Sequence, residues 1–357
     1  MRIAFFSKYL PSDEPNGVSV QADRLARALS SLGHTLTCFT FSPAPEGAEY
    51  EIVKLQWTRR SKLMRKFSPA VAFGKIPVSS FDIAHYHGDD YLCAGSPRRI
   101  RTFYGSAIDE AFHAGKVSRF MYQGLFYIFE WISCLKQGTF AGISATTLKC
   151  LPLVKSRIPC CVPLGSYFPS GPKTPHPSIL FVGDLDSRKR GSLLISAFHR
   201  DILPRFPGST LAVVGPEPCH GDGIVYKGRI TEKELIDEYR KAWVYCLPSS
   251  YEGFGVPAIE AMACGTAVVA TRNSGVAEIL KDGKNGILCE PQELGASLLK
   301  VIGDRELSES LTAEGMISAK RYDSRKIAAE YEKLYENALD NRSQPILENR
   351  LTHNVFL

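Results

Sequence analysis

Residues Ser249 to Gly265 read SSYEGFGVPAIEAMACG and form the most informative segment of the chain. Pro257 suits the first position of a helix and Gly265 the position just past its end, which predicts a short helix over residues 257–263. A glycine-containing loop leads into this helix. Because the first N–H groups of a helix are unpaired and its dipole is positive there, the sequence predicts an anion site that a diphosphate would fit.

Two carboxylates flank that site. Glu252 lies in the loop and Glu260 in the helix, in a Glu-x7-Glu arrangement. A carboxylate repels phosphate, so if both groups bind the ligand they must accept hydrogen bonds from hydroxyls on either side of it. A nucleotide sugar offers one sugar on each flank of a diphosphate. A plainer interpretation stays open, in which Glu260 complements the helix dipole and Glu252 is solvated.

Strands and helices alternate on both sides of this stretch. The first half opens with a strand over residues 2–7, a turn-rich loop over 11–17, a helix over 20–32 and a strand over 36–41. The second half repeats the pattern, with strands at 178–182, 210–214, 224–226, 244–247 and 266–271 and helices at 192–198, 232–242 and 257–263. The alternation predicts an α/β protein with two doubly wound parallel sheets, whose ligands bind beyond the carboxyl ends of the strands.

The chain of 357 residues has room for two domains. A proline-studded segment over residues 166–178 predicts the linker between a domain at 1–165 and another at 179–323. Beyond them we expect a helix at 324–340 that packs back on the first domain, and a polar tail at 341–357.

The composition is that of an ordinary folded protein. Hydrophobic residues make up 44% of the chain and charged residues 22%, which excludes a disordered, collagenous or fibrous protein. The apolar run at the start is too short for a signal peptide, and residues 120–135 are too few to span a bilayer. The 10 cysteines lack the spacing of metal-binding motifs. We therefore expect a reduced, cytoplasmic protein.

Basic charge is concentrated in the first half. Residues 1–163 carry 20 Lys and Arg against 12 Asp and Glu, whereas the remainder carries 23 against 25. The basic residues gather at Arg59, Arg60, Lys62, Arg65 and Lys66 and again at Arg98, Arg99 and Arg101. A solvated face is the commoner explanation of such runs. As a binding surface, they favour an anionic membrane or a phosphorylated partner over nucleic acid, for which no motif is present.

The sequence around Glu252 resembles the signature of the family 4 retaining glycosyltransferases, which have the GT-B fold. The motif is Glu-Gly-Phe-Gly-x-Pro-x-x-Glu-Ala, followed by Gly275-x-x-Glu278-Ile279-Leu280 and Asp282-Gly283-x-Asn285-Gly286. Weaker likenesses extend it over nearly the whole chain, at Asn16-Gly17-Val18, His85-Tyr86-His87, Phe181-Val182-Gly183 and Tyr226-Lys227-Gly228-Arg229-Ile230. The resemblance implies two Rossmann-like domains that face a central cleft, the first binding an acceptor and the second a nucleotide sugar.

The resemblance also implies roles for individual residues. Glu260 would bind the ribose hydroxyls and Glu252 the transferred sugar. Backbone amides of Phe254, Gly255 and Val256 would contact the sugar and the diphosphate.

Further donor contacts are implied at the edges of the site. Gly17 would let the first loop approach the phosphates, because it has no side chain. Gly228 and Ile230 would border the nucleobase. The family places a lysine before a glycine to bind the diphosphate, and Lys189 or Arg190 meets that position.

One departure from the family pattern concerns Asp184, which stands where the family has an arginine. Either Arg188 or Arg190 then supplies the second positive charge, or phosphate binding has one contact fewer. Asp184-x-Asp186 superficially matches the metal motif of the other glycosyltransferase fold, but the two-domain pattern around it is that of GT-B. We expect an enzyme without a metal cofactor.

A second departure is Tyr104, where many relatives have a histidine that faces the reaction centre. A phenol, with an ordinary pKa of about 10, is a poor proton shuttle at neutral pH, so Tyr104 is expected to position the substrate. The alternative is a core aromatic residue. His87, with Asp89 or Asp90 beside it at the end of the preceding strand, faces the cleft and offers acceptor contacts, or serves the fold.

The implied reaction transfers a sugar from a nucleoside diphosphate to a hydroxyl, with the anomeric configuration retained, in glycolipid, cell-envelope or polysaccharide synthesis. No carboxylate is placed as a nucleophile, which favours a front-face mechanism. The basic half predicts a lipid-linked or anionic acceptor and a peripheral membrane contact. Two alternatives stay open: a nucleotide-sugar epimerase of the same architecture, and a nucleotide-sugar-binding protein without activity. A dinucleotide oxidoreductase is disfavoured, because no Gly-x-Gly-x-x-Gly follows the first strand.

Overall fold

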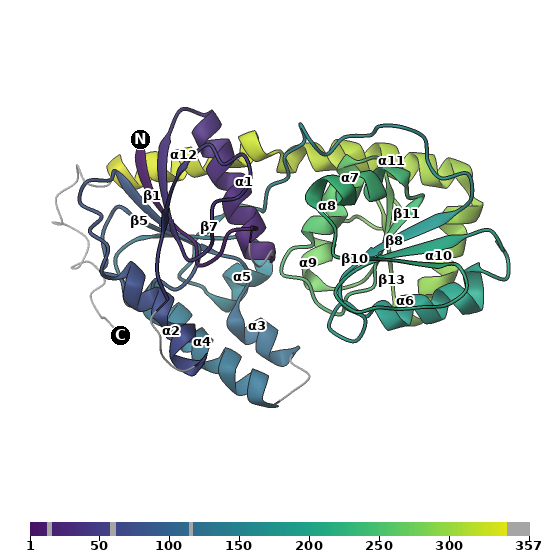
Figure 1. Cartoon of the computed structure of the whole chain (residues 1–357), viewed down its shortest axis with the longest axis horizontal. Helices are drawn as coiled ribbons and strands as arrows, with labels where there is room; N and C mark the ends of the chain where they lie inside the picture. Colours follow the sequence, from purple (N-terminus) through teal and green to yellow (C-terminus); the bar gives the residue numbers. More distant parts are fainter. Residues whose placement is uncertain (13–15, 58–61, 114–116, 341–357) are drawn as a thin grey trace, which may run out of the picture.

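Two separate parallel sheets organise the chain, one in each half (Figure 1). The computed structural model describes residues 1–12, 16–57, 62–113 and 117–340. The prediction of a polar tail at 341–357 falls outside the described residues. Within them, the two doubly wound sheets that the alternation of strands and helices predicts are present.

The first sheet has seven strands in the order β3-β2-β1-β4-β5-β6-β7. Every pairing in it is parallel. The strands are β1 Arg2–Phe6, β2 Thr35–Thr40, β3 Glu51–Lys54, β4 Ile83–Tyr86, β5 Arg99–Phe103, β6 Thr139–Gly142 and β7 Ser156–Arg157. The strand order reverses between β1 and β4, and open parallel sheets bind ligands beyond the carboxyl ends of the strands at such a point.

The second sheet has six strands in the order β10-β9-β8-β11-β12-β13, again all parallel. The strands are β8 Ser178–Val182, β9 Thr210–Val214, β10 Ile224–Gly228, β11 Val244–Leu247, β12 Ala267–Thr271 and β13 Ile287–Cys289. The order reverses between β8 and β11, so this sheet has its own switch point. The loops that follow these two strands carry several of the predicted donor residues.

Helices cover both sheets. In the first half they are α1 Gly17–Ser31, α2 Lys62–Phe73, α3 Ala107–Phe112, α4 Val117–Cys134 and α5 Ala145–Cys150. In the second half they are α6 Gly191–Ala197, α7 Glu232–Lys241, α8 Val256–Ala263, α9 Ser274–Ala277, α10 Leu294–Gly303, α11 Arg305–Ala319 and α12 Ser324–Asp340. The chain also has a π-helical segment, η1 Phe198–Ile202, and two 3-10 helices, η2 Pro291–Glu293 and η3 Lys320–Tyr322.

The start of α1 differs from the sequence prediction. We expected the helix from residue 20, but it begins at Gly17. Asn16 caps it, accepting a hydrogen bond from the Ser19 N–H at 3.0 Å, while the Ser19 hydroxyl oxygen accepts from the Asn16 N–H at 2.9 Å. This reciprocal capping box satisfies two backbone donors and starts the helix inside the stretch that composition alone assigns to a loop.

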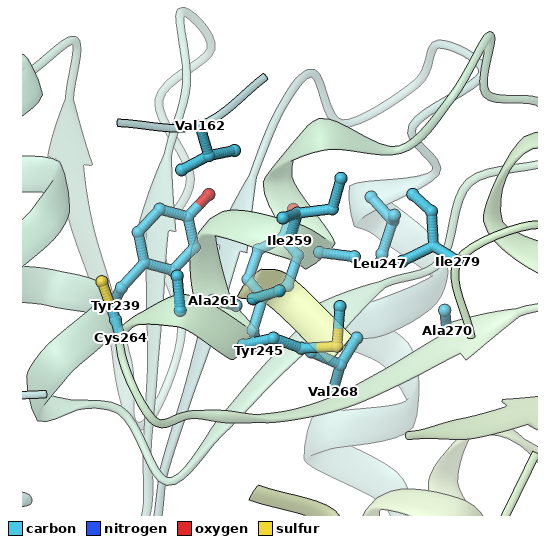
Figure 2. Packing of buried hydrophobic residues seen from close by; sticks show 14 of the residues in the cluster. Val162, Tyr239, Tyr245, Leu247, Ile259, Ala261, Cys264, Val268, Ala270 and Ile279 are labelled. Atoms are coloured by element: carbon cyan, nitrogen blue, oxygen red, sulfur yellow. The ribbon is translucent and has the colours of Figure 1, made fainter. Parts of the chain in front are cut away.

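The core of the second domain has two parts: one lies between its sheet and helices α7 and α8, and the other covers the opposite face of the sheet with α6, α10 and α11. Figure 2 shows part of it, with Tyr239 of α7, Ile259 and Ala261 of α8, and Tyr245 and Val268 from the strands packed together. The residues of α8 are apolar on nearly every side, and the helix is buried as expected for such a sequence. The core therefore fixes the helix whose start was predicted to bind an anion.

The last helix, α12, lies against the first domain although it follows the second in the chain (Figure 1). Ile327, Tyr331 and Tyr335 are buried in the same cluster as Ile3 and Phe5 of β1. The Tyr335 hydroxyl also lies 2.7 Å from His85 Nδ1. The chain thus crosses between the domains a second time, at η3.

The second basic cluster is not a charged surface. Arg99 is 1% exposed and forms an ion pair with Asp90. The side chain of Arg101 is 12% exposed, with its Nε 3.5 Å from the same carboxylate. Burial of Arg99 and Arg101 inside the first domain removes most of this cluster from any binding face. Arg59 and Arg60, from the first cluster, lie outside the described residues.

Among the helices that the structure describes, none combines the length and the hydropathy that a membrane-spanning segment requires. All 10 cysteines fall within the described ranges; none of them has a disulfide partner there, and nine are buried.

Candidate active site

The start of α8 has the geometry that the sequence stretch predicts, one residue earlier than expected. The helix begins at Val256 and Pro257 occupies its second position. Gly255 precedes it with φ of 98°, a left-handed conformation that side chains disfavour. Gly265, with φ of 72°, follows the end of the helix.

The loop that carries Glu252 is held by close backbone packing. A Cβ at Gly275, in α9, would lie 2.1 Å from the Glu252 carbonyl oxygen, so only glycine fits there. Asn273 caps α9 and also donates a hydrogen bond from its side-chain amide to the Ser249 carbonyl at 3.1 Å. The Gly275 of the sequence motif therefore brings α9 against the Glu252 loop.

Glu252 forms ion pairs with two cations from the loop before α6. Its Oε1 lies 2.6 Å from Lys189 Nζ and its Oε2 3.0 Å from Arg188 Nη1. Glu252 itself is 5% exposed. Burial alone would raise the pKa of the Glu252 carboxyl, but Lys189 and Arg188 hold this pKa below its ordinary value. The structure therefore brings Glu252 and Lys189 together, with Arg188 as the second cation.

Glu260 is paired with a residue of the other domain. Its Oε1 lies 2.8 Å from Nη1 of Arg24 in α1, and its Oε2 accepts a hydrogen bond from the Tyr239 hydroxyl at 3.0 Å. Arg24 also donates to Glu232 at 2.8 Å and to the Tyr167 hydroxyl at 2.7 Å. The alternative that Glu260 only complements the helix dipole is therefore incomplete, because Glu260 also has a cationic partner outside its own helix. The alternative that Glu252 is solvated is wrong, because Glu252 is buried.

The remaining predicted donor residues come from several elements. Phe254 is buried, with its ring against Tyr322 at 5.7 Å between centroids. Gly228 ends β10 with φ of 69°, and Ile230 packs against the core of the second domain. Gly17 is the first residue of α1, and no described atom lies within 4 Å of a Cβ placed there.

Arg190 and Asp186 are held within the second domain. Arg190 precedes α6 in a left-handed conformation and donates to the Pro248 carbonyl at 2.7 Å and to the Thr271 hydroxyl at 2.9 Å. The Asp186 carboxylate accepts from the Ser192 hydroxyl at 2.6 Å. In the described residues, no group of three or more His, Cys, Asp or Glu side chains is arranged to hold a metal ion.

His87 and Tyr104 lie together in the first domain. The Tyr104 hydroxyl is 2.7 Å from His87 Nδ1. Burial, followed by the charges of His85 and Arg101, lowers the pKa of His87 well below its ordinary value, so the ring is neutral near pH 7. Burial likewise raises the pKa of Tyr104. A Cβ at Gly253 would lie 3.2 Å from the Tyr104 carbonyl oxygen, so this pair adjoins the Glu252 loop across the domain boundary.

Comparison with known proteins agrees with this geometry. Residues 167–316, which include α8 and both carboxylates, match the family model described as glycosyl transferases group 1. The matched residues are therefore similar to this family over most of the second domain.

Two curated relatives each match a little under half of the chain. An uncharacterised glycosyltransferase of Methanocaldococcus jannaschii is 37% identical over 181 residues, which cover 45% of this chain and 48% of the relative. A phosphatidyl-myo-inositol mannosyltransferase of Mycobacterium tuberculosis is 30% identical over 180 residues, covering 44% of this chain and 47% of the relative. The chain spans about half the length of the curated relatives it matches.

Solved structures match nearly the whole chain. Sucrose-phosphate synthase from Thermosynechococcus elongatus superposes with a TM-score of 0.77 at 20% identity, covering 95% of this chain and 99% of that one. HepE of Anabaena, solved in complex with UDP-glucose, superposes with a TM-score of 0.73 at 14% identity, covering 94% and 100%. The fold is therefore GT-B, as the resemblance implied.

Sequence reasoning missed the residues that meet this site from a distance. Arg24, Glu232 and Tyr167 are 65 to 208 positions apart in the chain pairwise, and no local motif marks them. Tyr167 is fully buried although it falls in the predicted linker. Arg24 and Glu232 also lie among other polar or charged residues of α1 and α7, so the sequence carries no local signal for this contact.

Proposed function

We propose that this chain is a retaining glycosyltransferase of family 4 that transfers a sugar from a nucleoside diphosphate to a hydroxyl acceptor. One observation carries the proposal: Glu252 before the start of α8 and Glu260 within it are both buried, with Lys189 and Arg188 beside Glu252. Carboxylates there suit hydroxyls, and the two cations suit a diphosphate between them.

The proposed reaction proceeds on one face of the sugar. The bond from the anomeric carbon to the diphosphate oxygen breaks, and a bond from the same carbon to the acceptor oxygen forms on the same face. The acceptor proton passes to the leaving diphosphate, so no external base is needed. Lys189, Arg188 and the N–H groups at the start of α8 stabilise the negative charge that develops on the phosphate.

The donor is a nucleotide sugar whose diphosphate takes over Lys189 and Arg188. That exchange frees Glu252 for the sugar hydroxyls. Glu260 binds the ribose, and Gly228 and Ile230 border the base. The UDP-glucose complex of Anabaena HepE supports a donor of this class. The reaction needs no metal, so activity in EDTA should equal activity with added Mg²⁺ or Mn²⁺.

The decisive experiment measures nucleotide binding and turnover in the same variants. Melting shifts with UDP, GDP, ADP and dTDP identify the base, and the matching sugar donors follow. Glu260→Gln should weaken binding of the bare nucleotide about tenfold, the value of one hydrogen bond to a charged group. Glu252→Gln should leave that binding within about twofold, because its role concerns the sugar, yet lower turnover about a hundredfold.

The results separate this proposal from its alternatives. Equal nucleotide affinity in wild type and both variants would remove the assigned roles. An altered donor sugar formed without any acceptor would indicate an epimerase. Tight donor binding with no release of nucleoside diphosphate would indicate a binding protein.

The acceptor is lipid-linked, and the protein contacts the membrane through α4. Six apolar side chains on that helix and just past it are exposed at spacings of three and four residues, and so lie on one face: Val117, Met121, Leu125, Ile128, Ile132 and Leu135. Nζ of Lys66, in α2, lies 4.0 Å from the centre of the Tyr122 ring, which brings a positive charge to α4. An apolar stripe with a basic flank suits an anionic lipid surface.

Vesicle cosedimentation tests this contact. Vesicles that contain phosphatidylglycerol should bind the wild type, and vesicles of phosphatidylcholine alone should bind it less. The double variant Met121→Gln with Ile128→Gln should lose binding while its melting temperature stays unchanged, since both side chains are exposed. Equal binding of the variant, or a stable dimer that hides α4, would contradict the membrane contact.

A further inference from the structure

A pocket of about 180 Å³ opens in the first domain beside the predicted reaction centre. It lies beyond β4 and β5, at the edge of the sheet where a ligand site is expected. His87, Arg101, Tyr104, Glu110, Gln123 and Glu130 supply its polar wall. Of these, only His87 and Tyr104 were predicted from the sequence as site residues.

The pocket wall has hydrogen-bond donors to spare. His87 is 4% exposed, and its Nε2 has no partner among the described residues. If Tyr104 donates to Nδ1, the neutral ring carries its proton on the unpaired Nε2; if Nδ1 donates, the Tyr104 hydroxyl keeps its own proton. Either tautomer leaves one donor unused. Within the described chain, Nη1 of Arg101 also lacks a hydrogen-bond partner, whereas its Nε faces the Asp90 carboxylate at 3.5 Å.

The same wall has a strong acceptor in Glu130 of α4. Its carboxylate accepts from the Ala107 N–H at 3.1 Å and from the Ser106 hydroxyl at 3.2 Å. These bonds use part of its capacity of about four lone pairs. Gln123 donates to Glu110 at 2.6 Å, which holds a second carboxylate at the pocket.

The charge balance decides which chemistry fits. One cation, Arg101, and two carboxylates, Glu110 and Glu130, line the pocket. A phosphate would lie beside both carboxylates in a partly buried site, where like charges repel strongly. A hydroxyl, in contrast, donates to a carboxylate and accepts from a guanidinium, an imidazole or a phenol. Phe103 and Phe126 give the pocket apolar walls that suit the C–H faces of a ring.

We propose that this pocket binds the reacting unit of the acceptor as a neutral, polyhydroxylated ring, and that Glu130 accepts a hydrogen bond from one of its hydroxyls. The inference rests on the proposed glycosyl transfer and narrows its acceptor. Any phosphate or lipid that the acceptor carries lies outside the pocket.

The test compares neutral polyols with their phosphorylated counterparts. Glucose and myo-inositol, and glucose 6-phosphate and myo-inositol 1-phosphate, are titrated at pH 8, above the pKa of about 7 of Glu130, against protein saturated with the nucleoside diphosphate that it binds. The neutral compounds should bind wild type, and Glu130→Gln should weaken their binding about tenfold. A second variant, Glu130→Asp, keeps the carboxylate charge that the first variant lacks, and should therefore restore part of the affinity.

Controls separate this inference from the proposed function. The exposed Glu49, outside the pocket, serves as the matched change Glu49→Gln and should alter nothing. Nucleotide melting shifts should be equal in all variants. The inference is overturned if both neutral compounds fail to bind, if Glu130→Gln binds them as wild type does, or if a phosphorylated compound binds about tenfold more tightly than its neutral form. Absence of any nucleotide shift in wild type would instead contradict the proposed function.

Discussion

At the scale of single residues, Glu252 and Glu260 differ in what surrounds them. Glu252 faces two cations of its own domain, whereas Glu260 faces an arginine of the other domain and a tyrosine hydroxyl. Hydroxyls of a donor must share or replace these partners. The cost of doing so depends on the cation that is displaced, so the basic residues near the site are expected to differ in importance.

Substitutions of Lys189 and Arg190 should have clearly different effects on nucleoside diphosphate binding. Lys189 reaches Glu252, while Arg190 is bonded to Pro248 and Thr271. Lys189→Met should therefore weaken nucleoside diphosphate binding about tenfold and leave binding of the bare nucleoside unchanged. Arg190→Met should mainly lower the melting temperature, because it loses two structural hydrogen bonds. Calorimetric titration of both ligands checks this, and a larger diphosphate loss in the Arg190 variant would reverse the assignment.

Glu130 should make stability depend on pH. Burial raises its pKa to about 7, with Glu110 adding to the rise and Ala107, Arg101 and Ser106 opposing it. Between pH 4.5 and about 7, Glu130 is therefore protonated in the folded protein but ionised in the unfolded chain. Stability from this group is therefore lost as pH rises through that window, by about 3 kcal/mol at most.

Glu130→Gln removes this titration. The melting temperature of the variant, taken relative to wild type at each pH, should rise from about pH 5 to about pH 8. A thermal scan at several pH values measures the difference, with Glu49→Gln as the control that should stay flat. A constant difference across the range would contradict the raised pKa.

At the scale of elements, glycines decide how closely the helix starts approach the site. Gly17 opens α1 into free space, whereas Gly275 of α9 touches the backbone of Glu252. The family resemblance implied that Gly17 lets the first loop approach the phosphates. Gly275 belongs to the sequence motif, but its contact with the Glu252 backbone follows only from the packing.

Alanine at these two glycines should have opposite effects. Gly17→Ala should keep the melting temperature or raise it slightly, since no described atom is within 4 Å of the new methyl group and alanine favours helix. It should weaken nucleoside diphosphate binding if the phosphates approach there. Gly275→Ala should destabilise the second domain, because its methyl group would lie 2.1 Å from a carbonyl oxygen. Unchanged nucleotide affinity in Gly17→Ala would remove its donor role.

At the scale of the whole molecule, Arg24 links the two domains. It lies in α1 of the first domain, is 6% exposed, and pairs with Glu260 and Glu232 of the second. The chain itself also links the domains, because α12 follows the second domain and packs on the first (Figure 1). If Glu260 binds the nucleotide as proposed, that binding and the closeness of the domains should be coupled.

Removing the arginine should cost much stability. Arg24→Met leaves the buried Glu260 carboxylate without its cation, and breaking such a pair costs about 3–5 kcal/mol. The loss should be smaller in the double variant with Glu260→Gln, where no buried charge remains at that position. Urea unfolding of the single and double variants measures this. Arg305→Met, which breaks an exposed pair with Glu309, is the control and should change stability much less than Arg24→Met does. Equal effects of the Arg24 and Arg305 variants would contradict the importance of the buried pair between Arg24 and Glu260 for stability.

Sequence alone determined the alternation of strands and helices, the short buried helix α8 and the two carboxylates beside it, because periodicity, glycine and proline placement and motif spacing act over a few residues. The prediction placed the start of α1 three residues too late, because the residues around the capping box of Asn16 and Ser19 have the composition of a loop. It held no sign that Arg99 and Arg101 are buried, because charge runs look alike on a surface and in a core.

Which groups meet at the site depends on the packing of the whole chain. Arg24 reaches Glu260 across 236 positions of sequence, and Glu130 shares a pocket with His87 and Tyr104 through the packing of α4 on the first sheet. Contacts of this kind depend on how two sheets and their covering helices are oriented in space. No local pattern records that orientation, because the free energy that fixes it is distributed over the buried surface of both domains.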